Sequence, residues 1–252
     1  MPQTSTLQTL ESPPKSPAKR HSVRVASRFC GPPGSGNGGY TVGLLSKHVG
    51  PQAEVTLKRP VPLDETMHVV GDSGNDAALM HGDVEIAIAR KAELAIEVPE
   101  GITFARAAAA RTRYLGYRSH PFPKCFVCGT GRSCDEAMCL FTGQVDADVV
   151  ASSWVPSAEL VCRTGEVTPE LVCAALDCPG AWSLLSGGGI AGPIVLGRMT
   201  YRVDRPIIPA ERYVVMGWAL GRERRKSFCG TAIYDAAGEV CAAAHATWIE
   251  IG

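Results

Sequence analysis

Two places in this 252-residue sequence put reactive or ligand-binding residue types beside a predicted helix. The first is GSGNGG, residues 34–39, which precedes an apolar helix-like run. It matches G-x-G-x-x-G, the pattern with which dinucleotide-binding proteins hold a pyrophosphate. That pattern binds a dinucleotide only inside a βαβ unit, and no second βα unit follows it here. We therefore exclude a dinucleotide and expect the glycines to let another ligand approach the N–H groups of a helix start.

The second place is Asp177, in the middle of the apolar run LVCAALDCPGAW. A carboxylate among apolar residues is destabilising unless it is paired or used, so its pKa should rise towards values that suit a base. Pro179 removes the hydrogen bond to the Ala175 carbonyl and predicts a kink in this helix. The alternative is that Asp177 faces solvent or accepts a structural hydrogen bond.

Four of the ten cysteines form a third candidate, with the spacing C-x2-C-x5-C-x4-C (Cys125, Cys128, Cys134 and Cys139). Four thiolates within reach of one another suit tetrahedral zinc. The spacing is shorter than in zinc ribbons and the second pair is not C-x2-C, so reduced structural thiols are the favoured interpretation. We predict no metal ion and no cofactor, with zinc at these four cysteines left as the alternative.

Composition excludes several classes of function. Lys and Arg number 25 and Asp and Glu number 25, so no basic surface of the kind that binds nucleic acid is predicted. Residues 1–22 are rich in Ser, Thr, Pro and Lys and should be a disordered tail without a secretory signal. Residues 184–197 are apolar but too short and too glycine-rich to span a membrane. We expect a cytoplasmic protein.

An internal repeat predicts the architecture. LKRPVPLDETMHVVG, residues 57–71, and VDRPIIPAERYVVMG, residues 203–217, align without a gap at an offset of 146 residues. Each copy reads as a strand end, a proline-rich bend and the start of the next strand. Since no helical crossover follows either copy, the strands should be antiparallel and the fold class α+β.

The elements around the repeat also recur. A strand candidate at 22–29 precedes a helix at 38–49, for which Asn37 is the expected N-cap and Gly50 the stop. In the second half a strand candidate at 149–155 precedes a helix that starts at Thr168-Pro169. Further strands follow in each half. In the second half they include a predicted hairpin around DAAG, residues 235–238.

This organisation, with the motif NGGYTVGLL at 37–45 and the run ELVCAALDCPGAW at 170–182, resembles the hotdog-fold acyl-CoA thioesterases in their tandem, double-hotdog form. The resemblance implies two antiparallel sheets, each wrapped round a central helix, that together form an intramolecular pseudo-dimer. It places a first domain at 23–118, a connector with the cysteine cluster at 119–144 and a second domain at 145–252.

The resemblance also implies an activity, which is hydrolysis of an acyl-CoA or acyl-carrier thioester. Such a reaction needs hydrogen-bond donors for the developing oxyanion and a group that attacks or activates water. The N–H groups of Gly39 and Tyr40 are the expected oxyanion donors, with Asn37 near the carbonyl and Gly38 against the substrate. Asp177 is the expected base or nucleophile.

Laying one helix on the other puts Ser46 at the position of Asp177, which predicts one complete site per chain and one degenerate site that keeps Ser46. The basic run that contains Arg225 would meet coenzyme A phosphates, although such a run is more often a solvated loop. The alternative function is a non-catalytic acyl or acyl-CoA binding protein. A hydratase is disfavoured because neither helix contains D-x4-H. Exposed sheet edges would allow homo-oligomers.

Overall fold

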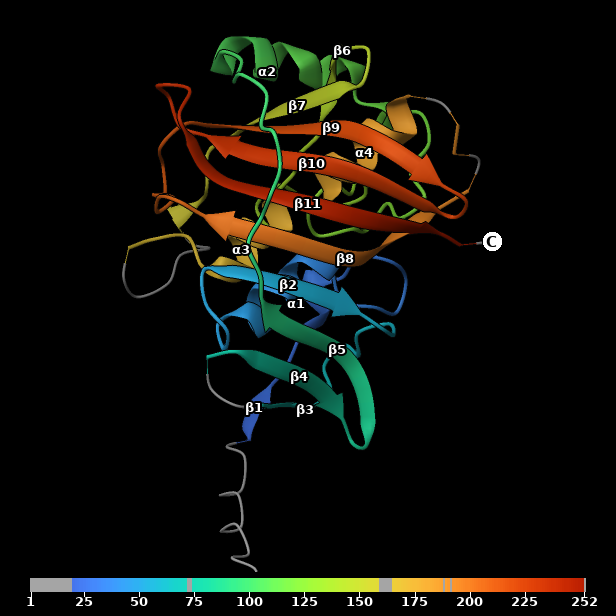
Figure 1. The fold of residues 1–252 in the computed structure, drawn as a ribbon. Coiled ribbons are helices and arrows are strands. Elements are labelled where there is room, and N and C mark those ends of the chain that lie inside the picture. Colours follow the sequence, from blue (N-terminus) through green and yellow to red (C-terminus); the bar gives the residue numbers. More distant parts are fainter. Residues whose placement is uncertain (1–19, 72–73, 159–164, 188, 191, 252) are drawn as a thin grey trace, which may run out of the picture.

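The structure, a computed structural model, describes residues 20–71, 74–158, 165–187, 189–190 and 192–251. Most of the tail predicted at residues 1–22 lies outside this part of the chain. Within it, eleven strands form one continuous sheet in the order β1-β3-β4-β5-β2-β8-β11-β10-β9-β7-β6 (Figure 1). Every pair of neighbouring strands is antiparallel, and the fold is α+β.

The strands fall into two groups that meet in the middle of the sheet. The first group is β1 (His21–Val23), β2 (Gln52–Leu57), β3 (Met67–Val70), β4 (Asp76–His81) and β5 (Val84–Lys91). The second is β6 (Gly143–Asp146), β7 (Val149–Trp154), β8 (Ile194–Val203), β9 (Tyr213–Glu223), β10 (Lys226–Tyr234) and β11 (Val240–Glu250). From β7 inwards, the second group repeats the strand order of the first.

The repeat seen in the sequence marks equivalent turns in the two groups. β2 ends at Leu57 and β3 begins at Met67, while β8 ends at Val203 and β9 begins at Tyr213. The predicted strand end, bend and strand start are therefore confirmed in both halves. Because β2 pairs with β8, from Gln52 opposite Arg202 to Thr56 opposite Arg198, the two groups join edge to edge. The prediction of two separate sheets is wrong in this respect.

Three helices pack behind the sheet (Figure 1). They are α1 (Gly38–Ser46), α3 (Pro169–Ala175) and α4 (Cys178–Ser186), and α1 lies directly against α3. Glycines permit this close approach, because a Cβ atom at Gly39 would lie 2.4 Å from the Cys173 carbonyl oxygen and one at Gly43 would lie 2.2 Å from the Pro169 carbonyl oxygen. Each half of the chain thus contributes one helix to the centre of the molecule.

The remaining segments cover the second group of strands. After β5 the chain crosses the front of the sheet to α2 (Phe104–Ala110), which packs on β7 (Figure 1). Apolar side chains from 94–104 join the core formed there by Val214, Met216 and Tyr234. Short 3-10 turns lie at Ser27–Phe29, Arg111–Arg113 and Leu115–Tyr117. The segment 92–110, predicted to belong to the first domain, therefore contacts the second.

Two local predictions differ from the structure. The strand expected at 22–29 is only the short β1 (His21–Val23), followed by a 3-10 turn at Ser27–Phe29. The alternation of apolar and polar residues stops at Ala26, just before this turn. The kink expected at Pro179 is a complete break, with α3 ending at Ala175 and α4 beginning at Cys178. The break carries Asp177, the N-cap residue of α4.

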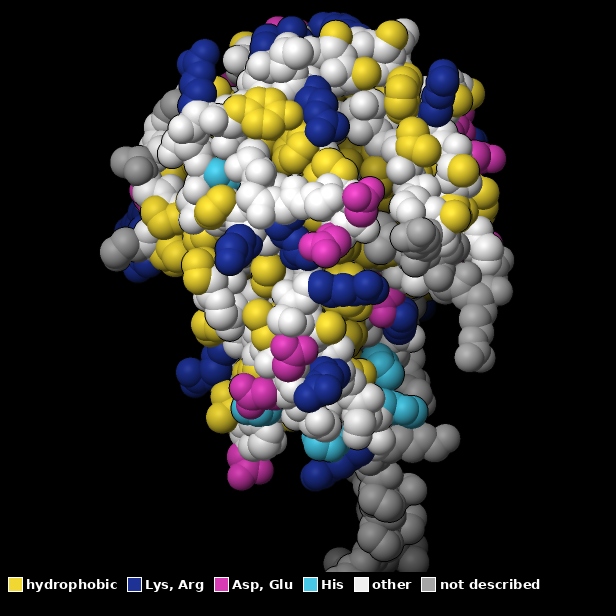
Figure 2. All heavy atoms as spheres, turned by 180° about the vertical axis from the view of Figure 1, so that it is seen from behind, with side chains coloured by type: hydrophobic (Ala, Val, Ile, Leu, Met, Phe, Trp, Pro, Cys, Tyr) yellow, Lys and Arg dark blue, Asp and Glu magenta, His cyan; other side chains and the backbone are white. Residues whose placement is uncertain are grey.

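The surface seen from behind carries Lys, Arg, Asp and Glu side chains interspersed among apolar ones (Figure 2). Among the described residues, no helix is both long and apolar enough to cross a membrane.

Candidate active site

The start of α1 is fixed by the side chain of Asn37. Its backbone is extended (φ −62°, ψ 135°), and its Oδ1 accepts a hydrogen bond of 2.8 Å from the Tyr40 N–H. This is the N-cap arrangement predicted from the sequence. The side chain is 2 % exposed, so its amide nitrogen points into the protein and not to solvent.

Asp177 lies in the break between α3 and α4 and is part of neither helix. Its side chain does not cap α4 and is 2 % exposed. Pro179, near the start of α4, has no N–H to donate, which favours a helix start at this point. The break therefore turns the carboxylate towards α1 of the other half of the chain.

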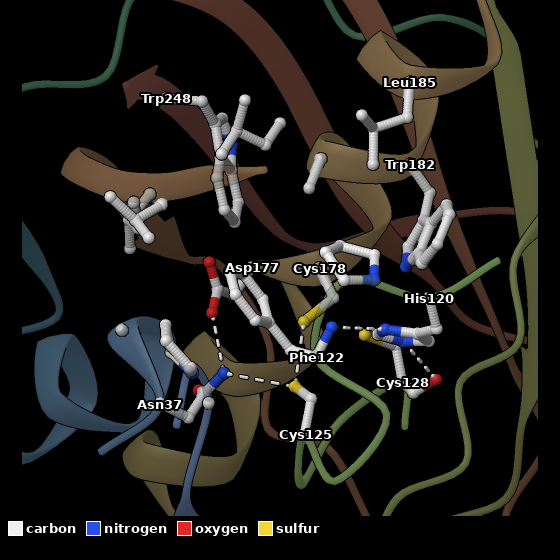
Figure 3. A pocket seen from close by; sticks show the side chains of 18 residues that line it. Asn37, His120, Phe122, Cys125, Cys128, Asp177, Cys178, Trp182, Leu185 and Trp248 are labelled. Atoms are coloured by element: carbon white, nitrogen blue, oxygen red, sulfur yellow. Dashed lines mark hydrogen bonds between the residues drawn. The ribbon is translucent and has the colours of Figure 1, made fainter. Parts of the chain in front are cut away.

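The carboxylate meets the start of α1 through one of its two oxygens. Oδ2 accepts a hydrogen bond of 2.9 Å from Asn37 Nδ2 (Figure 3). It also accepts one of 3.0 Å from the Gly39 N–H. The other oxygen, Oδ1, is buried and has no hydrogen-bond partner among the described residues. Asn37 and Asp177, 140 positions apart in the sequence, are thus in direct contact.

Burial and hydrogen bonding act on this carboxyl in opposite directions. Burial raises the pKa of Asp177 from its ordinary 3.8 to about 7, and the charge of Cys125 adds to the increase. The hydrogen bonds from Gly39 and Asn37 lower the pKa, because they stabilise the ionised form. The result is a carboxyl that exchanges its proton near neutral pH, as a general base requires.

A small pocket with a cavity volume of about 50 Å³, partly open to solvent, lies over Asn37 and Asp177. Its walls come from α1, α4, the connector and the start of β8, and they are mainly apolar (Figure 3). The remaining lining residues are Gly31, Pro32, Gly38, His120, Pro121, Phe122, Cys125, Cys128, Cys178, Ala181, Trp182, Leu185, Ile194, Val195, Leu196 and Trp248. An apolar cavity with a few convergent polar groups is the usual form of a small-molecule site.

Comparison with solved structures identifies the fold. A tesB protein of Mycobacterium avium subspecies paratuberculosis superposes with a TM-score of 0.60 at 11 % identity, over 92 % of this chain and 93 % of its own. A protein of Alicyclobacillus acidocaldarius described as having the hotdog fold gives 0.60 at 11 %, over 92 % and 93 %. The chain has the hotdog fold. A candidate thioesterase of Novosphingobium aromaticivorans also matches, with 0.60 at 12 % over 94 % and 97 %.

These likenesses are structural. No protein-family model matches the chain, and no curated protein matches it in sequence. The hotdog comparison therefore fixes the architecture, and the residues of this chain determine its chemistry.

The expected oxyanion donors are both engaged in the structure. The Gly39 N–H donates to Asp177 and the Tyr40 N–H donates to Asn37. Gly38 lines the pocket. The Tyr40 ring points elsewhere and stacks on Phe29 at 4.1 Å, where burial raises its pKa to about 12. Among these groups, Asn37 is the side chain that faces both the carboxylate and the pocket.

Ser46 and Arg225 lie away from the pocket. Ser46 is buried at the end of α1, donates to the Gly43 carbonyl and lines a different pocket beside the start of α3. Arg225 is in the β9–β10 turn, where its guanidinium donates to the Glu250 carbonyl at 2.9 and 3.2 Å. Neither residue lines the pocket over Asp177, and their roles in substrate binding stay predictions.

The four-cysteine zinc site does not form. Cys134 and Cys139 are joined in a disulfide, so their thiols cannot complete a zinc site with Cys125 and Cys128. Instead, Cys178 at the start of α4 lies beside this pair, and the three sulfur atoms are within 4.8 Å of one another. Sequence spacing did not indicate this cluster, because 50 residues separate Cys128 from Cys178 and only the fold brings them together.

Proposed function

We propose that the chain hydrolyses the thioester of an acyl-CoA or acyl-carrier substrate at one site that both halves build. In this proposal the halves are two hotdog units that form an intramolecular pseudo-dimer. The observation that carries it is the Asp177 carboxylate, held through Oδ2 by the start of α1, with Oδ1 free at the wall of an apolar pocket.

The pocket suits the two parts of such a substrate. Apolar side chains such as Phe122, Leu196 and Trp248 would cover the acyl group, and burial of its methylenes contributes about 0.8 kcal/mol each. The thioester carbonyl would then lie beside Asn37 and the start of α1. The positive end of the helix dipole favours negative charge at that place.

Asn37 is the donor best placed for the carbonyl oxygen. One hydrogen of its amide is used by Asp177, while Nδ2 has only a long contact of 4.0 Å to Cys125 Sγ in the other direction. A carbonyl oxygen would be a stronger acceptor than that thiol. Donors aimed at a developing oxyanion typically contribute a factor of about 10² to 10³ in rate.

The ionised Asp177 would supply the second requirement. As a base, Oδ1 takes a proton from water while the water oxygen bonds to the carbonyl carbon, and the carbon–sulfur bond then breaks with the thiolate as leaving group. As a nucleophile, Oδ1 itself bonds to that carbon, the carbon–sulfur bond breaks with the thiolate as leaving group, and water later hydrolyses the anhydride. A single turnover in H₂¹⁸O tests for the second route, because water that attacks the aspartyl carbonyl of the anhydride leaves ¹⁸O in the Asp177 side chain, which the first route cannot do.

The test is thiol release from acyl-CoAs of short, long and aromatic acyl groups. We expect the wild type to hydrolyse part of this panel and Asp177→Asn to lose at least a factor of about 10³ in kcat while still binding substrate. Asp146→Asn, which removes an exposed acid outside the pocket, should keep full activity.

A second function, binding of acyl-CoA without hydrolysis, is favoured by one observation. In the structure the Gly39 N–H is used by Asp177, so it is not free for a substrate carbonyl. A wild type that releases no thiol from any of these acyl-CoAs, yet melts at a higher temperature in their presence, would establish this function and refute hydrolysis.

A further inference from the structure

The cysteine cluster beside the pocket has the arrangement of a metal site. Cys125, Cys128 and Cys178 are 3 %, 4 % and 6 % exposed, and their three sulfur atoms converge on one point of the pocket wall (Figure 3). Buried cysteines that serve only as small apolar side chains have no need to direct their sulfur atoms towards one another.

The spacing of the sulfurs fits a single ion. Zinc–sulfur bonds of about 2.3 Å at tetrahedral angles place two thiolates about 3.8 Å apart. The Cys125 and Cys178 sulfurs are 3.7 Å apart, and the third lies within 4.8 Å of both. A disulfide between any two would need an approach to about 2.05 Å, whereas a metal ion needs only a small inward movement of Cys128.

The loop that carries the first two cysteines is held rigidly. Gly129 closes it by donating to the Cys125 carbonyl at 2.9 Å, and a Cβ atom at Gly129 would lie 2.5 Å from that oxygen. The Cys128 carbonyl accepts a hydrogen bond of 2.8 Å from the Tyr114 hydroxyl. The C-x2-C-G turn is therefore fixed in shape before any ion binds.

The Cys125 sulfur has hydrogen-bond donors around it. The neighbouring Cys128 and Cys178 thiols lower its pKa, and the Asn37 amide nitrogen lies 4.0 Å from it, while burial raises the pKa of the Cys128 thiol. Hydrogen bonds of this kind orient metal ligands and tune them in known sites.

We propose that Cys125, Cys128 and Cys178 bind one thiophilic divalent metal ion, with zinc as the ion that the geometry suits. The fourth position would face the pocket, which all three cysteines line, and would take water or a thiol. His120 is not the fourth ligand as it stands, because its Nδ1 accepts from the Phe122 N–H and its Nε2 contacts the Cys128 carbonyl. The ion would fasten the connector to α4 one residue from Asp177.

This inference does not depend on the proposed hydrolysis. Its first test is the zinc content of the full chain, purified with a reductant and without chelator, for which we expect about one ion per chain. The second is titration of the zinc-free protein with Co²⁺. Three thiolates around Co²⁺ should give sulfur-to-cobalt charge-transfer absorption and the strong visible bands of a tetrahedral ion, and both should disappear when zinc is added.

Serine variants locate the site. Cys125→Ser, Cys128→Ser and Cys178→Ser should each weaken Co²⁺ binding by more than the roughly 10- to 100-fold that loss of an outer hydrogen-bond partner costs. Cys241→Ser changes another buried free thiol outside the cluster and should bind as the wild type does. Circular dichroism checks that each variant is folded, and the wild-type titration stands even where a variant is not.

The opposite results overturn the proposal. These are a wild type with three reduced thiols that neither retains zinc nor gives a charge-transfer band, or variants that all keep the band. Detection of a Cys125–Cys178 disulfide by mass spectrometry, with no metal binding after its reduction, would equally refute a metal site and make the pair a redox element.

Discussion

Asp177→Asn should make the protein more stable at neutral and alkaline pH while it removes activity. The carboxyl is 2 % exposed, and its pKa rises from 3.8 to about 7 on folding because burial disfavours the charge. Folding therefore binds the proton more tightly, and the free energy of unfolding must fall as the pH rises from about 4 to about 7. Above pH 7 the group is ionised in both states and this contribution is constant.

The magnitude follows from the two acid constants. Each tenfold change in an acid constant corresponds to about 1.4 kcal/mol, so ionising this carboxyl in the fold costs on the order of 4 kcal/mol. An asparagine does not ionise, and its amide oxygen can still accept from Asn37 and Gly39. These hydrogen bonds to a neutral acceptor are weaker, so we expect a net gain of about 2 to 4 kcal/mol at pH 8.

Urea unfolding of both proteins, followed by tryptophan fluorescence at intervals from pH 4 to pH 9, measures this difference. Because all other titrating groups are common to the two chains, their effects largely cancel in the comparison. The two proteins should have similar stability near pH 4 and diverge up to pH 7. Asp146→Asn should follow the wild type throughout. An Asp177→Asn protein that is less stable than the wild type at pH 8 would refute the reasoning, because the ionised carboxylate would then be a net stabilising group.

Three further predictions concern the same region. Under the proposed hydrolysis, kcat/KM should increase with pH through an apparent pKa near 7 as Asp177 ionises; a profile that is flat from pH 5 to pH 9 contradicts this assignment. Asn37→Ala should lower kcat/KM by a factor of about 10² and the free energy of unfolding by about 1 kcal/mol. Thr168→Ala should change both quantities little, because the Thr168 side chain makes no capping hydrogen bond at the start of α3. Gly43→Ala should destabilise the fold by about 1 to 3 kcal/mol in urea titration, because the added methyl group meets the backbone of α3. Gly189→Ala serves as the control, since the added methyl group has open space around it. Equal effects of the two substitutions would mean that α1 and α3 do not pack as described.

Local signals in the sequence predicted the elements well where short-range physics determines them. The aligned segments at 57–71 and 203–217 mark true strand ends because proline and charged residues interrupt the same alternating pattern twice. Asn37 caps α1 as expected, since an N-cap bond involves only the next three residues. The closeness of Asp177 to Gly39 came from laying one helix on the other, which the internal repeat made possible.

Other features that depend on long-range packing were not predicted. Nothing local indicates that β2 and β8 pair, because both are ordinary alternating strands until their exposed edges meet. The helix α2 was missed because its run of alanines has a weak periodic signal. Cys178 was not associated with Cys125 because a contact across 53 residues has no characteristic spacing. One signal in the sequence was available, because Cys178 directly follows the candidate base Asp177 and therefore lies at the same pocket wall.

The continuous pairing of β2 with β8 has a consequence for how the two halves can change over time. In a pair of separate identical chains, every substitution occurs twice, so two symmetric sites gain or lose a residue together. Here both helices belong to one polypeptide, and each can mutate alone. Asp177 lines one pocket, and Ser46, its predicted counterpart in the other half, lines a different one, so a single substitution changes one of the two pockets alone.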